Sequence, residues 1–180
     1  WYEILLDYCK KNKIKTLLTA HNLEDQVETF LIRLSRGSGL KGLSSMKPLS
    51  KIDNQVNLSR PLLDIKKKFL IKISKIIFSN YIKDPSNKNS KFLRTKVRKL
   101  KKPLEQSGIK YEQIFKSIQN LALSKSTLDS YLNKIFKDLI KKKENKIEIN
   151  FKKYTELKPD TKIALINEAI KRLKKNYYDL

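Results

Sequence analysis

A short β-prone segment that leads directly into an amphipathic helical pattern is the feature that most constrains the fold of this chain. Residues 14–20, IKTLLTA, have the length and composition of a buried strand of a parallel sheet. The following residues predict a helix over about 22–36 that ends at Gly37, because glycine permits a helix C-cap and a tight turn. The apolar face of this helix, which we expect to pack on the sheet, consists of Val27, Phe30, Leu31 and Leu34. A strand followed by such a helix is the unit of an α/β fold.

The same alternation of helix and strand extends over the first half of the chain. Residues 1–12 have apolar side chains at helical spacing, and QVNLSRPLL (55–63) predicts a second strand with Pro61 at its end or at a sheet edge. Asp64 is expected to N-cap a further helix that continues to about Ser79. We therefore expect an α/β domain in this half.

The second half of the chain has a different pattern. The turn-rich segment KDPSNKNS (83–90) is the best candidate for a linker. Helical patterns and one β-prone piece follow it, with the helices at 91–106, 110–142 and 159–177 and the β-prone piece at 146–151. We predict two domains, an α/β domain over residues 1–88 and a mainly helical domain over residues 89–180.

The charge of the chain points to an anionic partner. Lysine and arginine outnumber aspartate and glutamate by 41 to 18, which gives a formal net charge of +23. Such an excess favours nucleic acid first and an anionic membrane surface second, although the strong lysine bias also fits compositional drift. No apolar run approaches the roughly 18 residues that span a membrane, so we expect no membrane partner. The single cysteine, Cys9, excludes an internal disulfide and fits a cytoplasmic location.

The only histidine of the chain begins a set of polar residues at helical spacing. His21, Asp25 and Glu28 are related as i, i+4 and i+7 and therefore share one face of the predicted helix. A helix that starts at the carboxyl end of a strand points its first turn toward the crevice where open α/β sheets bind ligands. Spacing leaves three interpretations open: a solvated helix face, a metal site, or an active site whose carboxylates bind an ammonium group, a magnesium–nucleotide complex or a proton.

Three of the four glycines of the chain lie just after this helix, in RGSGLKG. A Gly-Ser-Gly turn exposes backbone N–H groups that can bind phosphate or allow a ligand to approach closely. Arg36, at the start of the turn, offers a planar guanidinium suited to phosphate. An ordinary helix end followed by a turn explains any one of these glycines, but three glycines flanked by Arg33 and Arg36 favour a ligand site.

Three blocks in a fixed order make the sequence specific. TAHNLEDQVETFLIRLSRGSGLKGLSSM (19–46), SRPLL (59–63) and KDPSNKNSKFLRTKVR (83–98) resemble the tRNA(Ile)-lysidine synthetase family. The resemblance covers roughly residues 1–106, whereas the remaining residues agree with the family in being helical and basic. His-x3-Asp-x2-Glu-Thr by itself is similar only to the wider group of PP-loop ATP pyrophosphatases. The family implies the C-terminal part of a Rossmann-like parallel-sheet domain, followed by a mainly helical domain.

The resemblance implies a reaction and its partners. The family uses ATP to adenylate C2 of the wobble cytidine of tRNA(Ile) with a CAU anticodon, and the ε-amino group of free L-lysine then displaces AMP. Mg²⁺ is the implied metal, as the companion of ATP. Asp25 and Glu28 suit the lysine ammonium or a nucleotide-bound magnesium, and either could take the proton of the attacking amine. The sequence leaves open whether the protein forms a homodimer.

The same resemblance assigns site residues by motif. The implied catalytic residues are His21, Asp25 and Glu28. The implied substrate- and nucleotide-binding residues are Thr29, Arg36, Gly37, Ser38, Gly39 and Arg60. The implied tRNA-binding residues are Asp84, Asn87, Arg94 and Arg98, with Ser86 in the same block. On physical grounds, Arg94 and Arg98 lie one turn apart on a basic helix, so we expect them to bind tRNA phosphates.

One departure from the family pattern matters. The Ser-Gly-Gly-x-Asp-Ser turn that names the PP-loop is absent from the 180 residues, and the chain begins at Trp1 within an amphipathic pattern. We therefore interpret the chain as a truncated form and expect that by itself it neither binds ATP tightly nor makes lysidine.

Two alternative functions stay open from the sequence. The first is a non-catalytic RNA-binding module that uses the basic helices and makes no covalent change. The second is another PP-loop tRNA-modifying enzyme such as a thiolase. Thiolases commonly add cysteine pairs for sulfur chemistry or an iron–sulfur cluster, so the single Cys9 argues against this alternative.

Overall fold

The computed structural model describes residues 2–79, 92–143 and 146–173 of the chain. These residues form two compact units, residues 1–122 and residues 123–180, and the division falls within one long helix, α7 (Tyr111–Leu139). The predicted boundary between residues 88 and 89 lies outside the described residues and stays a prediction. No helix of the described chain is long and apolar enough to cross a membrane.

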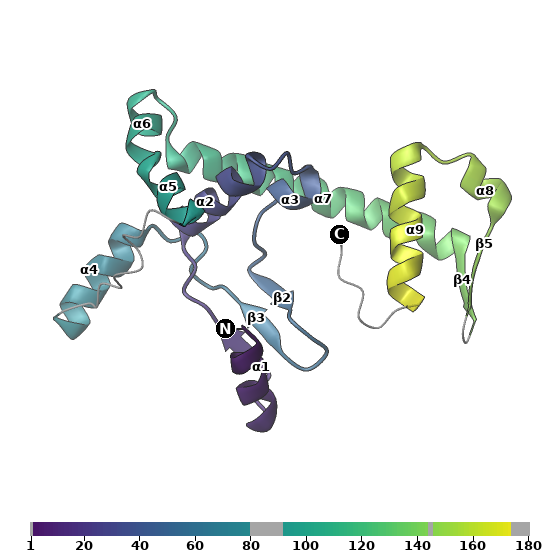
Figure 1. The fold of residues 1–180 in the computed structure, drawn as a ribbon, viewed down its shortest axis with the longest axis horizontal. Helices are drawn as coiled ribbons and strands as arrows, with labels where there is room; N and C mark the ends of the chain where they lie inside the picture. Colours follow the sequence, from purple (N-terminus) through teal and green to yellow (C-terminus); the bar gives the residue numbers. More distant parts are fainter. Residues whose placement is uncertain (1, 80–91, 144–145, 174–180) are drawn as a thin grey trace. The chain divides into compact units, whose positions relative to one another are not determined.

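A small mixed sheet lies in the first unit (Figure 1). Its strands are β1 (Thr16–Leu18), β2 (Leu49–Lys51) and β3 (Asn57–Ser59), in the order β1-β3-β2. β1 and β3 are parallel, with Leu17 opposite Leu58, which agrees with the expectation of a parallel sheet. β2 is antiparallel to β3 and was not predicted, because LSK has too few residues for a recognisable alternation.

The expected burial of the first strand is wrong. Leu18 is 66% exposed, Thr16 is also exposed and Leu17 is half-buried, whereas Leu58 on the central strand is buried. An apolar run of this length predicts a strand, but it does not say how many layers cover the strand. The fold class is nevertheless α/β, with a parallel crossover from β1 to β3.

Helices make up the remainder of the first unit. They are α1 (Tyr2–Lys11), α2 (Leu23–Leu34), α3 (Leu40–Leu43), α4 (Lys67–Phe78), α5 (Leu93–Lys99), α6 (Lys101–Gln106) and the first part of α7. The predicted single helix over 91–106 is broken at Leu100. Pro103 lies four residues after Lys99 and lacks the N–H that would bond to the Lys99 carbonyl in a continuous helix.

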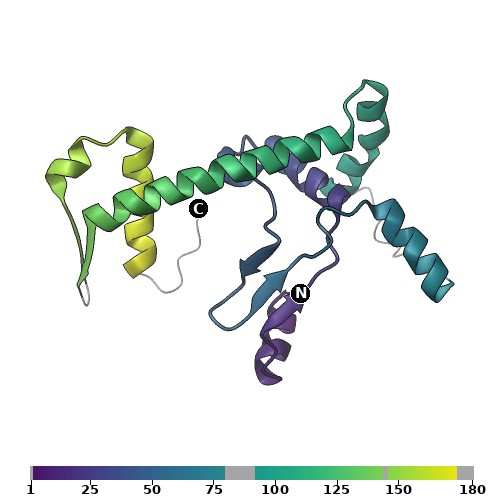
Figure 2. The same cartoon turned by 180° about the vertical axis from the view of Figure 1, so that it is seen from behind.

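The core of the first unit lies between α2 and α7, which run side by side in both ribbon views (Figures 1 and 2). Its buried residues are Leu23, Val27, Tyr111 and Ile118, and Phe30, Leu31, Leu104, Ile114 and Phe115 pack against them. The apolar stripe of α2 therefore packs on α7 and not on the sheet as expected, and Leu34 is 50% exposed. Helical spacing identifies an apolar face without identifying the element that covers it.

The cap of α4 also differs from the prediction. The N-cap position is Lys66, not Asp64, and no side chain of the helix itself caps it. The Lys67 N–H instead donates a 2.8 Å hydrogen bond to Glu24 Oε2 on α2. A carboxylate from a distant helix thus performs the capping role that the sequence assigned to a neighbour.

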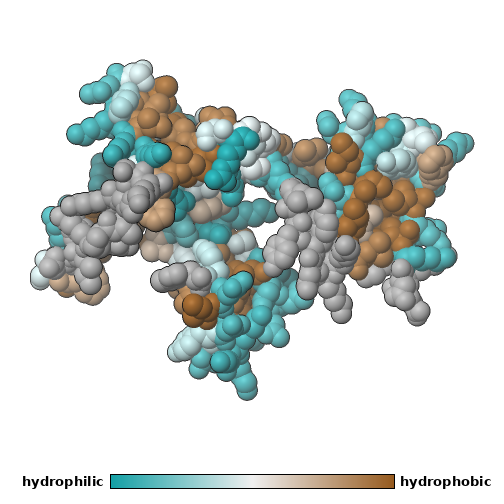
Figure 3. Space-filling view, viewed as in Figure 1, coloured by the Kyte–Doolittle hydropathy of each residue, from teal (hydrophilic) through white to brown (hydrophobic). Residues whose placement is uncertain are grey.

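The second unit combines a hairpin with two helices. The strands β4 (Ile140–Lys143) and β5 (Lys146–Ile149) are antiparallel, and α8 (Phe151–Thr155) and α9 (Pro159–Leu173) follow. Its core consists of Phe136, Leu139, Ile140, Leu165 and Ala169, and apolar side chains gather over α9 (Figure 3). The predicted helix over 110–142 ends three residues early because 140–143 pair with β5; IKKK has no alternation that would predict a strand.

Candidate active site on helix α2

The first turn of α2 is held by a reciprocal cap. The Asp25 N–H donates to Asn22 Oδ1 at 3.2 Å, and the Asn22 N–H donates to Asp25 Oδ2 at 3.0 Å. This capping box fixes the entry into the helix and orients the Asp25 carboxylate. Asp25 is therefore part of the structural start of the helix as well as a candidate catalytic residue.

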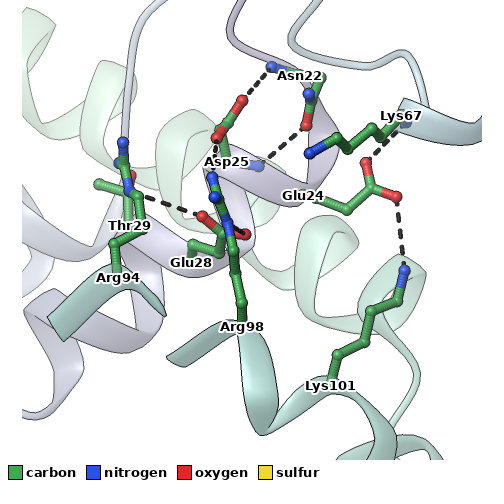
Figure 4. Close-up of polar contacts among 9 residues, drawn as sticks. All are labelled: Asn22, Glu24, Asp25, Glu28, Thr29, Lys67, Arg94, Arg98 and Lys101. Atoms are coloured by element: carbon green, nitrogen blue, oxygen red, sulfur yellow. Dashed lines mark hydrogen bonds and ion pairs between the residues drawn. The ribbon is translucent and has the colours of Figure 1, made fainter. Parts of the chain in front are cut away.

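Helix α5 brings two arginines to the carboxylates of α2, as Figure 4 shows. Arg98 Nε donates a 2.7 Å hydrogen bond to Glu28 Oε1, and Arg98 Nη2 lies 3.5 Å from Asp25 Oδ1. Arg94 Nη2 donates to Thr29 Oγ1 at 2.9 Å, and Arg94 Nε lies 3.6 Å from Glu28 Oε2. Five predicted site residues thus form one cluster, in which two carboxylates face two guanidinium groups.

Glu28 is the most buried member of this cluster. Its residue exposure is 3%, and among the described residues its Oε2 atom accepts no hydrogen bond. Burial, which penalises the charged carboxylate, raises the pKa of Glu28 above its usual value, against the opposing effect of Arg98. A carboxylate with an unused acceptor and a raised pKa is suited to accept a proton from a substrate.

His21 lies beside this cluster, just before α2. Its Nδ1 atom is 2.9 Å from Thr19 Oγ1. Burial lowers the pKa of His21 from 6.5, with Arg60 and Arg94 acting in the same direction and Asp25 acting against them. The imidazole is therefore neutral at pH 7 and able to accept a proton or a hydrogen bond.

Comparison with known proteins gives this cluster its context. The sequence model of the PP-loop domain matches residues 1–104. The chain belongs to the PP-loop domain family. It is 33% identical over 178 residues to the tRNA(Ile)-lysidine synthase of Wolbachia pipientis wMel, a match that covers 98% of this chain and 41% of that protein.

Further relatives carry the same name. The tRNA(Ile)-lysidine synthase of Orientia tsutsugamushi (strain Boryong) is 44% identical over 103 residues, which is 57% of this chain and 23% of that protein. The tRNA(Ile)-lysidine synthase of Wolbachia sp. subsp. Brugia malayi is 33% identical over 178 residues, which is 98% of this chain and 41% of that protein. These similarities confirm the resemblance derived from the three sequence blocks. The chain spans about two fifths of the length of these Wolbachia relatives.

The glycine turn of this PP-loop domain lies at the other end of α2. Gly37 has a φ of +67°, which favours glycine, and Arg33 Nη1 holds the turn by donating to the Gly42 carbonyl at 2.7 Å. At 1.5 Å per residue, Asp25 and the last residue of α2, Leu34, are separated by about 13.5 Å along the helix, and the turn follows Leu34. The structure thus places the glycine turn and the carboxylate cluster at opposite ends of one helix, and the turn's role in nucleotide binding stays a prediction.

Arg60 lies at the end of β3 and braces the sheet. Its Nη1 atom donates to the Lys47 carbonyl at 2.9 Å and to Ser50 Oγ at 3.1 Å. Its Nε atom is buried and has no hydrogen-bond partner among the described residues. Arg60 also contributes to the lowered pKa of His21. Its predicted contact with substrate is therefore compatible with its position near His21 but is not tested by these contacts.

The remaining predicted tRNA-binding positions cannot be placed. Asp84, Ser86 and Asn87 lie outside the described residues. Arg94 and Arg98 lie on α5 and contact the carboxylates of α2, with side-chain exposures of 41% and 28%. Their contact with tRNA phosphates stays a prediction, whereas their contact with Asp25 and Glu28 is a feature of the fold.

The cluster does not have the composition of a dedicated metal site. The described residues contain no group of three histidine, cysteine, aspartate or glutamate side chains that could hold a metal ion. Asp25 and Glu28 are balanced by Arg94 and Arg98, so they leave no excess negative charge for a divalent cation. The residues present therefore do not fit a Mg²⁺ ion bound by this chain alone.

Sequence reasoning missed several residues that build the site. Gln26 is buried and its side chain bonds to Met46, with Nε2 donating to the carbonyl at 2.9 Å and Oε1 accepting from the N–H at 3.0 Å. Glu24 caps α4, and Tyr111 belongs to the buried core and lines a pocket together with Glu28. The asparagine and aspartate of the capping box were a readable signal, since Asn-x-x-Asp resembles the pattern of a helix start. Nothing in the sequence marked the distant partners of Glu24 and Gln26.

Proposed function

We propose that the chain is the part of a tRNA(Ile)-lysidine synthase that binds lysine and presents it to the wobble cytidine. The observation that carries this proposal is the 33% identity to the Wolbachia pipientis enzyme over 98% of the chain. The carboxylate and arginine cluster of α2 and α5 supports it, because Glu28 Oε2 accepts no hydrogen bond from the described residues and can accept one from the substrate amine.

In the proposed reaction, ATP activates C2 of the cytidine by adenylation, and the lysine ε-amino group attacks that carbon. The C2–oxygen bond to AMP then breaks, AMP leaves, and the nitrogen loses a proton. Glu28 accepts this proton, since its pKa is raised by burial and its Oε2 atom has a free acceptor. The neutral imidazole of His21 is the second acceptor within the cluster.

Arg98 is a positioning residue in this proposal. It bridges Glu28 and Asp25 and so holds both carboxylates in one arrangement, in which Glu28 Oε2 accepts no hydrogen bond from the described residues. The more exposed Arg94 and the unplaced Asp84 and Asn87 are assigned to the tRNA, as are the basic helices that follow. Mg²⁺ is assigned to the phosphates of ATP and not to residues of this chain. A cytoplasmic location is proposed with the same activity.

The test is incorporation of radiolabelled lysine into tRNA(Ile) with a CAU anticodon, by the protein that contains this chain. Glu28→Gln should abolish incorporation and leave tRNA affinity nearly unchanged, because the change removes the proton acceptor and keeps the shape. Glu3→Gln, an exposed carboxylate on α1, is the matched control and should keep full activity.

Two outcomes would contradict the proposal. Tight binding of tRNA without any lysine incorporation would favour the RNA-binding module that makes no covalent change, a function that the net charge of +23 also supports. A large loss of tRNA affinity in Glu28→Gln would indicate that Glu28 has a structural role in the site and is not the proton acceptor.

A further inference from the structure

A pocket of about 300 Å³ lies on the side of Glu28 that faces α4 and α7. It is lined by residues of α2, α4, α5, α6 and α7, all within the first unit: Glu24, Glu28, Lys67, Lys68, Ile71, Arg98, Lys101 and Tyr111. Four of these side chains are cationic and two are anionic, so the lining has an excess of two positive charges. Neither the proposed lysine site nor the family motifs assign Lys67, Lys68, Lys101 or Tyr111.

The carboxylates of this lining are already neutralised. Glu28 is bonded to Arg98, and Glu24 lies 3.5 Å from Lys101 Nζ while its other oxygen caps α4. Among the described residues, the ammonium groups of Lys67 and Lys68 have no carboxylate partner. The uncompensated charge of the pocket is therefore that of two neighbouring lysines in the first turn of a 12-residue helix, where the helix dipole also favours an anion.

Tyr111 provides a second, independent feature. The residue is 2% exposed, lines the pocket, and its hydroxyl has no hydrogen-bond partner in the described part of the chain. Buried hydroxyl groups are normally paired, and an orphan beside a pocket indicates a missing partner. Burial, together with the charge of Glu28, raises the pKa of Tyr111 to about 12, so the hydroxyl keeps its proton at neutral pH and can donate it in a hydrogen bond.

Lys101 lies over the aromatic ring of Tyr111. Its ammonium group lies 5.1 Å from the centre of the Tyr111 ring and forms long, partly exposed pairs with Glu24 and Glu105, at 3.5 and 4.0 Å. Such pairs contribute little stability, so Lys101 can turn toward a bound anion at low cost.

We propose that this pocket binds a phosphate group of the RNA backbone, with Lys67, Lys68 and Lys101 pairing with its charge and Tyr111 donating to one of its oxygens. A phosphodiester accepts hydrogen bonds and donates none, which matches these four groups because all of them are donors. Only Lys101 among them has a carboxylate partner within the described residues. The proposal rests on the proposed function for its RNA, and it adds a contact that lies directly behind Glu28. A bound RNA would thus be held next to Glu28, the residue that accepts the proton in the proposed function.

Binding of fluorescently labelled tRNA(Ile) to the full chain at several salt concentrations tests this pocket. Lys68→Gln should weaken binding and lower the slope of log K against log salt by about one, because one phosphate contact is lost. Lys72→Gln removes the same charge from an exposed position of α4 outside the pocket and should leave the slope unchanged.

A second pair of variants isolates the hydroxyl group. Tyr111→Phe should weaken tRNA binding about three- to tenfold with an unchanged salt slope, because it removes a neutral donor. Its urea midpoint should match the wild type, since the hydroxyl bonds to no described residue. Tyr131→Phe, on an exposed part of the same helix, is the control and should bind as the wild type does.

The outcomes separate the pocket from the proposed function. If the wild-type chain binds tRNA and both Lys68→Gln and Tyr111→Phe behave as their controls, the pocket proposal is wrong and the proposed function stands. If the wild-type chain binds no tRNA, the RNA substrate itself is wrong. If cytidine 5′-monophosphate binds the wild type and is lost in Tyr111→Phe while tRNA affinity is unchanged, the pocket serves a free nucleotide and the RNA contact is overturned.

Discussion

Arg98 on α5 donates a 2.7 Å hydrogen bond to Glu28 on α2, a residue 70 positions earlier in the chain. The contact joins two sequence blocks that the family resemblance treats as separate, one assigned to catalysis and one to tRNA. Because the Glu28 side chain is 5% exposed and the Arg98 side chain 28% exposed, the pair is only partly screened by solvent.

The Glu28–Arg98 pair should show a measurable interaction free energy. In a double-mutant cycle of Glu28→Gln and Arg98→Gln, we expect each single change to lower the free energy of unfolding by about 1–3 kcal/mol and the double change to cost less than their sum. Urea denaturation of the four proteins measures this. The more exposed Lys66–Glu112 pair, in the same unit, is the control and should give at most about 1 kcal/mol. Equal coupling in both cycles would contradict a special role for Arg98.

Glu24 should stabilise the start of α4 from outside that helix. Glu24→Ala leaves the Lys67 N–H without its acceptor, so we expect a loss of about 1 kcal/mol and faster hydrogen exchange over Lys67–Phe78. Exchange followed by mass spectrometry measures both. Asp64→Ala is the matched control, since Asp64 has the better sequence context but is not the cap. Faster exchange of α4 in Asp64→Ala, with no change in Glu24→Ala, would reverse the assignment.

These contacts show which features of the fold could be predicted from the sequence. Local spacing predicted the helices α1, α2, α7 and α9 and the two strands β1 and β3. Each of these depends on side chains within a few turns of one another. The pairing of Glu28 with Arg98 depends on the tertiary fold, which brings together residues 70 positions apart in the sequence. Local periodicity carries no information on such a contact.

The failures have the same origin. The apolar stripe of α2 was assigned to the sheet but packs on α7, because a stripe shows that something covers it and not what covers it. Asp64 was assigned as the cap of α4 because it is near the start of that helix in the sequence. The residue that accepts the hydrogen bond from the Lys67 N–H is Glu24, 43 positions away. The strand β4 was predicted as the end of a helix. Its lysine-rich sequence has no strand pattern of its own, and it becomes a strand by pairing with β5.

Gln26 should hold the loop that follows the glycine turn. Gln26→Leu keeps the side-chain size and removes the bonds to both backbone groups of Met46, so we expect a loss of about 2–3 kcal/mol because these groups become unpaired. Urea denaturation gives the loss, and limited proteolysis should show new cleavage near residues 44–46. Gln119→Leu, at an exposed site on α7, should change neither; a similar loss there would indicate a general effect of added leucine.

His21 should titrate below 6.5, and as the only histidine it gives a single imidazole signal in an NMR titration. Burial and the charges of Arg60 and Arg94 favour the neutral ring, whereas Asp25 favours the protonated ring. Asp25→Asn should therefore lower the pKa of His21 further. Because the unfolded chain binds the proton more readily than the folded chain, stability should be lost as the pH falls below about 6.5. His21→Gln should lose less stability over the same interval, and an imidazole pKa above 6.5 would show that Asp25 outweighs burial at this site.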